Sequence, residues 1–521
     1  MIFLKVKNKL TIIFLIVILI ISTVSMTSCK QAETHGAAQQ DGNTHMQLSD
    51  FSEKRIGVME GTVQEVMVRE RFPKADISVF NSVPDMPLAL ESGAIDGFVG
   101  DSYIVNEILR NKPSLMILDE PIGAVETSLA FPKTDDGAKL RDRMDEFLAK
   151  CRADGSLDEM TDMWFSEKAS ESSVDMSGIP ENGPVLNFAT TGIAIPFSFF
   201  KGSEVHGFDI DLAVRFCREY GYRLNIETMS FPSIIPGLVA GKYDFAGNGI
   251  FVTEERRESV YFSEVYCTMD IVFATEKPGE AAPSESFWDI AADNFEKTFI
   301  REDRWKMIAQ GTGTTILIAA SSALLGTLMG FGLCLLHRMK NKLVHAITTA
   351  YIRIMQGTPQ LVLLMIMFYL IFANSGISGT WVAVFTFALN FAAYACVTFC
   401  TGIDAVDIGQ TEAALATGYT RRQAFLRVVM PQAIPKILPV YQGELISLLK
   451  MTSIVGYIAV QDLTKMSDII RSRTYQAFFP LIVTAVIYFI ISWLLMSLLK
   501  SICIRIEPNR TDRRIKGVKM R

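Results

Sequence analysis

A polar stretch from Glu412 to Pro431 interrupts the hydrophobic second half of the chain and gathers charged side chains there. It reads EAALATGYTRRQAFLRVVMP: helix-forming residues begin it, Gly418 breaks it, and three arginines precede the closing proline. Apolar spans flank the stretch on both sides, and its excess of basic residues predicts a cytoplasmic location. The residues therefore predict a short cytosolic helix-turn-helix between two membrane helices, whose charged groups are available for non-covalent contacts.

Motifs for covalent chemistry are absent from the sequence. The phosphate-binding pattern Gly-x-x-x-x-Gly-Lys-Ser/Thr does not occur. Eight cysteines are scattered without a Cys-x-x-Cys pair or a histidine partner, and their spacing does not say whether any two form a disulfide. We therefore expect no catalytic residue, no metal site and no cofactor in this chain, so that any ATP is bound by another polypeptide.

The composition places part of the chain in a membrane. Hydrophobic residues make up 49% of the sequence and the mean hydropathy is +0.26, more than a soluble protein usually carries. The basic tail is typical of a cytosolic end at a membrane and makes nucleic-acid binding the weaker interpretation. With the N-terminus outside, we expect five spans, at about 309–336, 350–373, 380–402, 434–460 and 477–503. Residues 461–476 are then expected to form an outer loop, although Lys465, Arg471 and Arg473 there run against the charge rule.

The N-terminus has the layout of a secretory signal. Three lysines precede the apolar run 10–21, and a short small-residue stretch leads to Cys29. Met26-Thr27-Ser28-Cys29 resembles a lipobox, which would make Cys29 a lipidation site, and the alternative is an uncleaved signal-anchor. Under both interpretations the next segment lies outside the cell membrane, and residues 30–47 are predicted to form a flexible tether.

Two stretches between the tether and the membrane alternate short apolar strands with helical segments. They run from Phe51 to about 168 and from Val185 to about 276, joined by a linker rich in Gly, Ser and Pro. This alternation predicts mostly parallel sheets. Each stretch is smaller than an average domain, so the two are expected to form two lobes of one receptor.

The spacing of the polar stretch is more specific than a bare Glu-Ala-Ala. The glycine and the final aliphatic-x-aliphatic-Pro stand at the intervals found in the EAA loop of ABC importer permeases, which the stretch resembles. The resemblance implies a coupling helix that docks on an ABC ATPase subunit, in a permease that works as a homodimer; the alternative is a solvated linking loop. The residues that carry it are Glu412, Ala413, Ala414, Gly418 and Pro431.

The outer half resembles two-lobed amino-acid-binding periplasmic proteins. PFSFF, GFDIDLA, GKYDFAG and VTEERR, all within 196–257, are similar to their first lobe, whereas KRIGVMEGT and ESGAIDGFVGDS, within 54–102, are similar to their second. The lobes thus stand in reversed order. Circular permutation of this kind is tolerated because the ends of compact domains often lie close together.

The resemblance also implies a ligand site. An α-amino acid needs a guanidinium for its carboxylate and a carboxylate for its ammonium. Arg256 matches the family's arginine and Asp101 its aspartate. The alternatives are a solvated charged face for Arg256 and a helix cap for Asp101.

Further contacts are implied around these two residues. Backbone amides near Gly249 and Phe251 would help to bind the carboxylate, and Phe231 matches a pocket aromatic or is simply core. The remaining two predicted ligand contacts are Thr62 and Asn248. Ala194 replaces a stacking aromatic of the family, which leaves the identity of the amino acid open.

Taken together, the sequence predicts a multidomain protein: a two-lobed α/β receptor of the type II periplasmic-binding fold, followed by an all-α transmembrane permease of about five helices. The rivals are a ligand-gated channel and a transmembrane sensor, neither of which explains the EAA spacing. The expected parts are a signal (1–29), tether (30–47), second-lobe-like unit (48–168), linker (169–184), first-lobe-like unit (185–280), second linker (281–305), permease (306–507) and cytosolic tail (508–521).

Overall fold

The computed structural model describes residues 46–506, apart from 61, 81–82, 167–168, 279–286, 374, 475 and 477. The predicted signal with Cys29, the tether up to residue 45 and the tail 508–521 lie outside the described residues. By packing, the chain divides into two compact units. One consists of the chain up to Gly100 with Pro113–Ile122 and Val272–Glu280, and the other consists of the remainder.

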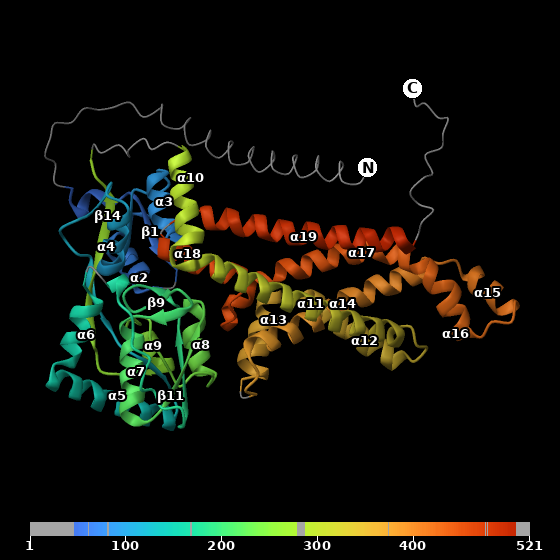
Figure 1. Ribbon diagram of the computed structural model, residues 1–521, viewed down its shortest axis with the longest axis horizontal. Helices are drawn as coiled ribbons and strands as arrows, with labels where there is room; N and C mark the ends of the chain where they lie inside the picture. The colour runs from blue at the N-terminus through green and yellow to red at the C-terminus, as the bar shows by residue number, and fades with distance from the viewer. Residues whose placement is uncertain are drawn as a thin grey trace. The chain divides into compact units, whose positions relative to one another are not determined.

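The first sheet joins, in order, β2 (Asp76–Phe80), β1 (Arg55–Met59), β3 (Gly97–Asp101), β14 (Cys267–Glu276) and β4 (Leu115–Ile117), with β5 (Gly123–Thr127) paired to β14 (Figure 1). β1 pairs in parallel with β2 and β3, as the alternating pattern predicted, whereas β14 runs antiparallel to β4 and β5. Ile56 and Val58 of β1 are fully buried, as in a central strand. The helical segments of this stretch are η1 (Leu48–Phe51), α2 (Val63–Arg71), α3 (Asp85–Glu91) and α4 (Ser102–Asn111).

The second sheet has the order β11 (Arg223–Thr228), β7 (Val185–Thr190), β12 (Phe245–Ala246), β6 (Ala130–Pro132) and β13 (Val260–Phe262). Phe188 and Phe216 both pack against Phe245 in its core, and all three rings are fully buried. A small antiparallel sheet consists of β10 (Glu204–His206), β9 (Ser198–Lys201) and β8 (Ile193–Ala194). The helical segments are α5 (Asp135–Asp154), α6 (Ser156–Trp164), η2 (Ala169–Glu171), α7 (Phe208–Tyr220), η3 (Phe231–Ser233), α8 (Ile234–Val239) and α9 (Glu254–Ser259).

Each of the two larger sheets contains an inner strand from the other stretch of the chain. β14 lies between β3 and β4 in the first sheet, and β6 lies between β12 and β13 in the second. The compositional linker at 169–184 is therefore not where one sheet ends and the other begins. Local periodicity does not reveal this exchange, because it depends on pairing between strands more than a hundred residues apart.

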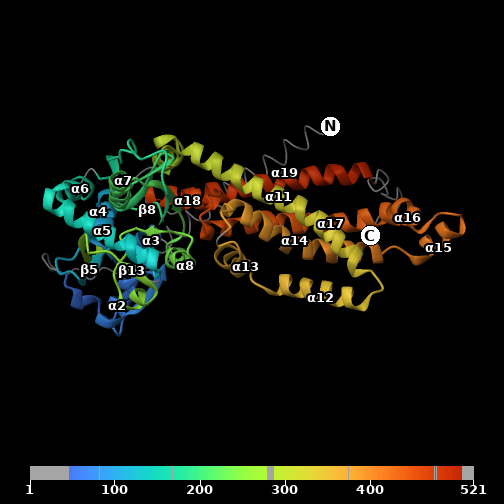
Figure 2. The same cartoon turned by 90° about the horizontal axis from the view of Figure 1, so that it is seen from below.

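The second half of the chain is helical. Two of its long helices, α11 and α14, approach each other closely at a glycine. A Cβ on Gly326 of α11 would lie 2.8 Å from the Ala388 carbonyl oxygen of α14, so only glycine permits this approach. Both views show α11, α14 and α17 side by side (Figures 1 and 2). The elements are α10 (Phe287–Phe295), η4 (Glu296–Ile300), η5 (Arg301–Asp303), α11 (Arg304–His337), α12 (Lys342–Gly357), α13 (Gln360–Ile366), η6 (Met367–Ile371), α14 (Gly379–Asp404), α15 (Ile408–Ala416), α16 (Arg421–Ala424), η7 (Phe425–Val429), α17 (Met430–Met451), η8 (Thr452–Ile458), α18 (Leu463–Thr474) and α19 (Phe479–Ile506).

Three described helices are long and apolar enough to cross a membrane: Ala291–His337, Gly379–Asp404 and Phe479–Ser501. Two further pairs meet the same test together but are bent, by 108° between α12 and α13 and by 56° between α17–η8 and α18. The predicted number of five spans is reached if each bent pair is one span. The sharper bend falls at Thr358-Pro359, where proline removes a backbone donor and disfavours helix before it.

One local expectation was wrong. Residues 461–476 were predicted as an outer loop, but α18 fills most of this range. Lys465 is buried there and its Nζ donates to the Met229 carbonyl 3.1 Å away. Arg473 pairs with Glu302. Lys465 and Arg473 therefore have acceptors far away in the sequence, whereas Arg471 pairs with Asp468 on its own helix.

Candidate amino-acid site and coupling segment

Arg256 is held at a defined place by the start of its helix. The hydroxyl of Thr253 accepts a hydrogen bond from the Arg256 backbone N–H at 3.1 Å and caps α9. The guanidinium Nη1 donates to the Phe251 carbonyl at 3.0 Å, and the guanidinium carbon lies 5.4 Å from the centre of the Phe231 ring. The structure thus brings together three residues predicted from separate motifs.

The surroundings of Arg256 suit a charged ligand. The side chain is half-buried, and burial lowers its pKa from the usual value while Glu255 opposes the shift. Arginine nevertheless stays protonated, because its ordinary pKa is above 12. A planar guanidinium over an aromatic face is ready to accept a carboxylate in a forked geometry, and the solvated-face interpretation does not apply to this residue.

The loop from Gly247 to Phe251 follows β12 and leads to Arg256. Asn248 Oδ1 accepts a hydrogen bond from the Thr191 hydroxyl at 2.5 Å, which ties the loop to the end of β7. Gly249 adopts a left-handed backbone with φ of 59°, and its N–H donates to Asp209 Oδ2 at 2.8 Å. The amide predicted to meet a ligand carboxylate therefore already has a protein acceptor in this structure.

Asp101 and Thr62 both stand at helix starts. Asp101 ends β3 at the N-cap position of α4 and is largely buried, yet its side chain accepts no capping hydrogen bond from that helix. The simple helix-cap alternative for Asp101 is therefore not realised. Thr62 occupies the N-cap position of α2, in the other compact unit, and its hydroxyl donates to the Met59 carbonyl at 2.7 Å.

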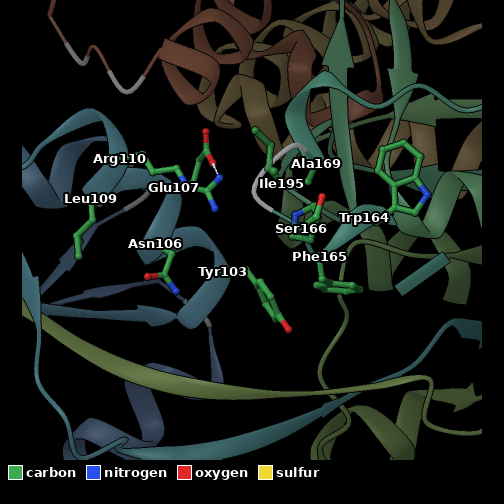
Figure 3. Close-up of a pocket in the computed structure, with 11 residues that line it drawn as sticks. Tyr103, Asn106, Glu107, Leu109, Arg110, Trp164, Phe165, Ser166, Ala169 and Ile195 are labelled. Atoms are coloured by element: carbon green, nitrogen blue, oxygen red, sulfur yellow. Dashed lines mark hydrogen bonds and ion pairs between the residues drawn. The ribbon is translucent and has the colours of Figure 1, made fainter. Parts of the chain in front are cut away.

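A cavity of about 530 Å³ lies beside α4 (Figure 3). At its wall the ring centres of Tyr103 and Phe165 are 4.6 Å apart. Glu107 Oε2 forms an ion pair with Arg110 Nη1 at 2.8 Å. None of the predicted ligand residues is among its described lining residues. The sequence prediction did not include this face, although Tyr103, Asn106, Glu107 and Arg110 recur at the helical spacing that places side chains together.

The polar stretch 412–431, for which a coupling role is predicted and which is called the coupling segment from here on, has the predicted helix-turn-helix form. Gly418 lies between α15 and α16 with φ of 89°, and Thr420 opens α16 in a reciprocal capping box with Gln423. Glu412 is exposed, whereas Ala414 is buried. Figures 1 and 2 both place α15 and α16 at one end of the helical bundle, beyond α11 and α14.

The remaining predicted residues of this segment, Ala413 and Pro431, are also exposed. The Gln432 side chain donates to the Gln410 side chain at 3.2 Å and so connects α17 with α15. The segment is therefore an ordered surface element with exposed side chains.

Two protein families match the chain. Residues 186–363 match the bacterial extracellular solute-binding proteins, family 3, and residues 322–506 match the binding-protein-dependent transport system inner membrane component. The first match begins at β7, one residue into the strand.

Individual relatives agree with the second match. The chain is 32% identical over 200 residues to a putative glutamine transport system permease protein, GlnP, of Rickettsia felis, across 37% of this chain and 90% of that protein. It is 31% identical over 204 residues to the arginine transport system permease protein ArtQ of Bacillus subtilis, across 39% and 93%. A crystal structure of an amino acid ABC transporter with histidines is similar over 43% of this chain and 100% of that chain, with 32% identity and a TM-score of 0.37.

The two family matches together cover residues 186–506, and the permease relatives are more than 30% identical over the helical part. They agree with the order in which receptor and permease were expected. The chain thus belongs to the inner-membrane permeases of amino-acid ABC importers and carries a solute-binding domain of family 3 on the same polypeptide.

Proposed function

We propose that this chain is the combined receptor and permease subunit of an importer for an amino acid, driven by a separate ATPase. The observation that carries the proposal is the guanidinium of Arg256, held between the Phe231 ring and the Phe251 carbonyl. The relatives named for glutamine and arginine, together with one named for L-cystine in Bacillus subtilis, support an amino acid as the substrate.

Arg256 binds the α-carboxylate in this proposal. A carboxylate can accept two parallel N–H bonds from one guanidinium, which a backbone carbonyl cannot do. Exchange of the Phe251 carbonyl for the ligand therefore strengthens the contact without moving the arginine far. Asp101 binds the ammonium, because a buried carboxylate prefers a cationic partner.

The coupling segment transmits the ATPase cycle. Glu412 and the turn at Gly418 meet the ATPase on the cytoplasmic side, while the receptor lies on the outer side of the inner membrane. Neither ATP binding nor covalent chemistry is assigned to this chain, which is consistent with the absence of a phosphate-binding loop from its sequence.

Two copies of the chain form the transport pathway, with one receptor for each copy. One set of spans supplies half of a symmetric pathway, and closed two-fold assemblies are the commonest among homo-oligomers. Mass measurement of the full chain with its ATPase in nanodiscs should give two copies of each. One copy of the chain per two ATPases would contradict this arrangement.

The central experiment is a thermal-shift screen of the full chain in nanodiscs against the twenty amino acids, with L-cystine added. One or a few of them should raise the melting temperature, because a ligand that binds the native state stabilises it by mass action. Arg256→Ala should remove the shift. A wild-type chain that responds to none of them would refute the amino-acid receptor.

A further inference from the structure

Asp209 is a carboxylate without solvent contact in the lobe that carries Arg256. It lies in the first turn of α7 and is 0% exposed. Its Oδ2 accepts the Gly249 backbone N–H at 2.8 Å, and its Oδ1 accepts the Tyr266 hydroxyl at 2.7 Å. The two donors come from the loop that leads to Arg256 and from the residue that precedes β14.

The loop is shaped around this carboxylate. A Cβ on Gly247 would lie 2.9 Å from Asp209 Oδ2, and a Cβ on Gly249 would lie 2.7 Å from the Phe197 ring. Both positions therefore require glycine while their neighbours stay in place; at Gly247 these neighbours also include Leu129, at 2.7 Å from the Cβ position. A backbone amide can only donate, so a non-polar residue at 209 would leave the buried Gly249 N–H without its acceptor.

The other oxygen of the carboxylate, Asp209 Oδ1, links the loop to Tyr266, the residue before β14. The Tyr266 N–H donates to the Thr127 carbonyl at 3.1 Å, and the Thr127 hydroxyl donates to the Cys267 carbonyl at 2.8 Å. Thr127 ends β5 and Cys267 begins β14, which are paired. Asp209 therefore bridges the ligand loop and the paired strands through which the chain passes from one sheet to the other.

A neighbouring aspartate provides a contrast on the same helix. Asp211 is also buried, but its Oδ2 accepts the Trp164 indole N–H at 3.0 Å and its Oδ1 pairs with Arg215 at 3.0 Å. These contacts tie α7 to α6 and do not involve the loop 247–251. The two aspartates of GFDIDLA thus have separate tasks, one of which concerns the loop.

We infer that Asp209 is a positioning residue for the amino-acid site, which holds the loop 247–251, and through it Arg256, in the geometry that binds the ligand. The ligand part of this inference rests on the proposed function. Asp209 acts through Gly249 and does not touch the ligand itself.

Retaining a carboxylate here has a cost, which argues for a task beyond packing. Burial raises the pKa of Asp209 to about 7, and the hydrogen bonds from Tyr266 and Gly249 offset only part of that shift. The titratable groups that face it are Tyr266 and Cys267, and no cation is among the causes of the shift within the described residues. A hydrophobic residue would avoid this cost but would release the loop.

The test compares three variants of the full chain in nanodiscs. Asp209→Asn keeps one acceptor for Gly249 and a donor for the Tyr266 oxygen, so it should bind within about threefold of wild type. Asp209→Ala removes both contacts and should weaken affinity roughly ten- to a hundredfold. Asp211→Asn, the matched control, should lower the melting temperature yet leave affinity unchanged. The probe is whichever of L-glutamine, L-arginine and L-cystine stabilises the wild type most.

Amide hydrogen exchange gives a second readout that needs no ligand. Exchange at 247–251 should accelerate in Asp209→Ala and stay slow in Asp209→Asn and Asp211→Asn. Wild-type exchange in the loop of Asp209→Ala, or equal loss of affinity in Asp209→Ala and Asp211→Asn, would overturn the inference. If no amino acid binds the wild type, the proposed function fails, and the exchange data still decide whether Asp209 holds the loop.

Discussion

The loop 247–251, proposed to bind the ligand, and the segment 412–431, proposed to couple to the ATPase, present their polar groups in opposite ways. In the loop 247–251 and at Arg256, polar groups are half-buried or buried and each has a partner within the same lobe. In the coupling segment, Glu412 and Gly418 are exposed, and the order comes from the backbone: a capped helix, a left-handed glycine and a second capped helix.

The difference fits the partners proposed for the two regions, which differ in size. A small zwitterion offers few contacts, so affinity depends on groups fixed before it arrives. A protein partner covers a large area, so the surface needs a defined shape and accessible side chains more than buried ones. Substitutions should therefore act through geometry at the ligand site and through surface chemistry at the coupling segment.

The largest effect is expected from Gly418→Asp, which should reduce amino-acid uptake to background while ligand binding stays intact. No atom lies within 4 Å of a Cβ at Gly418, so the new side chain points into open space and places a charge on the docking surface. Uptake into proteoliposomes with the ATPase, measured beside ligand affinity, checks this.

Gly418→Ala is the matched control for that variant. It introduces the same left-handed strain, about 1 kcal/mol, without a charge, and should retain part of the uptake. If Gly418→Asp transported normally, the segment would not be the docking surface.

A large effect on affinity is expected from Arg256→Ala. Loss of one partner of a desolvated charged contact typically weakens binding by roughly tens- to thousands-fold. Arg256→Lys keeps the charge but loses the forked hydrogen bonds, so its affinity should lie between those of wild type and Arg256→Ala. Calorimetric titration with the stabilising amino acid provides the measurement.

Arg257→Ala serves as the control for Arg256. Arg257 is half exposed, and its nearest acidic oxygen, on Glu254, is 3.6 Å away, so affinity should not change. If the two variants behaved alike, the ligand carboxylate would have to be bound elsewhere.

A smaller but substantial effect is expected from Asp101→Ala, because the ammonium is a compact, well-hydrated charge that loses less when its partner is removed. Affinity should fall by roughly tenfold. In Asp101→Asn the affinity should fall less, because the amide carbonyl oxygen can still accept a hydrogen bond from the ammonium. An unchanged affinity in both variants would leave the ammonium without its assigned partner.

The smallest effect concerns pH. The pKa of Asp209 rises from 3.8 to about 7 on folding, so its protonated form stabilises the fold. That contribution is complete below about pH 4, declines as pH rises and is gone above about pH 7. The melting temperature of wild type relative to Asp209→Asn should therefore fall by about a few degrees between pH 5 and pH 8. A constant difference would show that Asp209 titrates outside this window.

The sequence carried the features that depend on neighbours along the chain. The parallel pairing of β1, β2 and β3 and the turn at Gly418 were predicted, and three residues named for the ligand site, Arg256, Phe231 and Phe251, lie close together. Motif spacing reports local geometry well, because caps and turns are specified by residues within a few positions.

Features that depend on distant pairing were not predicted. Nothing in GFDIDLA distinguishes Asp209 from Asp211, since both are buried and only their partners, Gly249 and Trp164, separate their tasks. The helix α18 was predicted as a loop, and two of its basic residues, Lys465 and Arg473, have partners more than a hundred residues earlier. The lining of the cavity beside α4 likewise combines segments far apart in the chain.

The exchange of strands between the sheets also governs how the protein can be made. β14 is an inner strand of the first sheet but the last of its strands to be synthesised, so β4 has no neighbour on that side until residue 276 has emerged. The hydrophobic stretch Ala291–His337 follows within a few dozen residues. Long-range pairing is slow compared with local structure, and unpaired strand edges invite aggregation. We therefore expect the first sheet to be completed at about the time when Ala291–His337, the earliest membrane-span candidate among the described residues, leaves the ribosome.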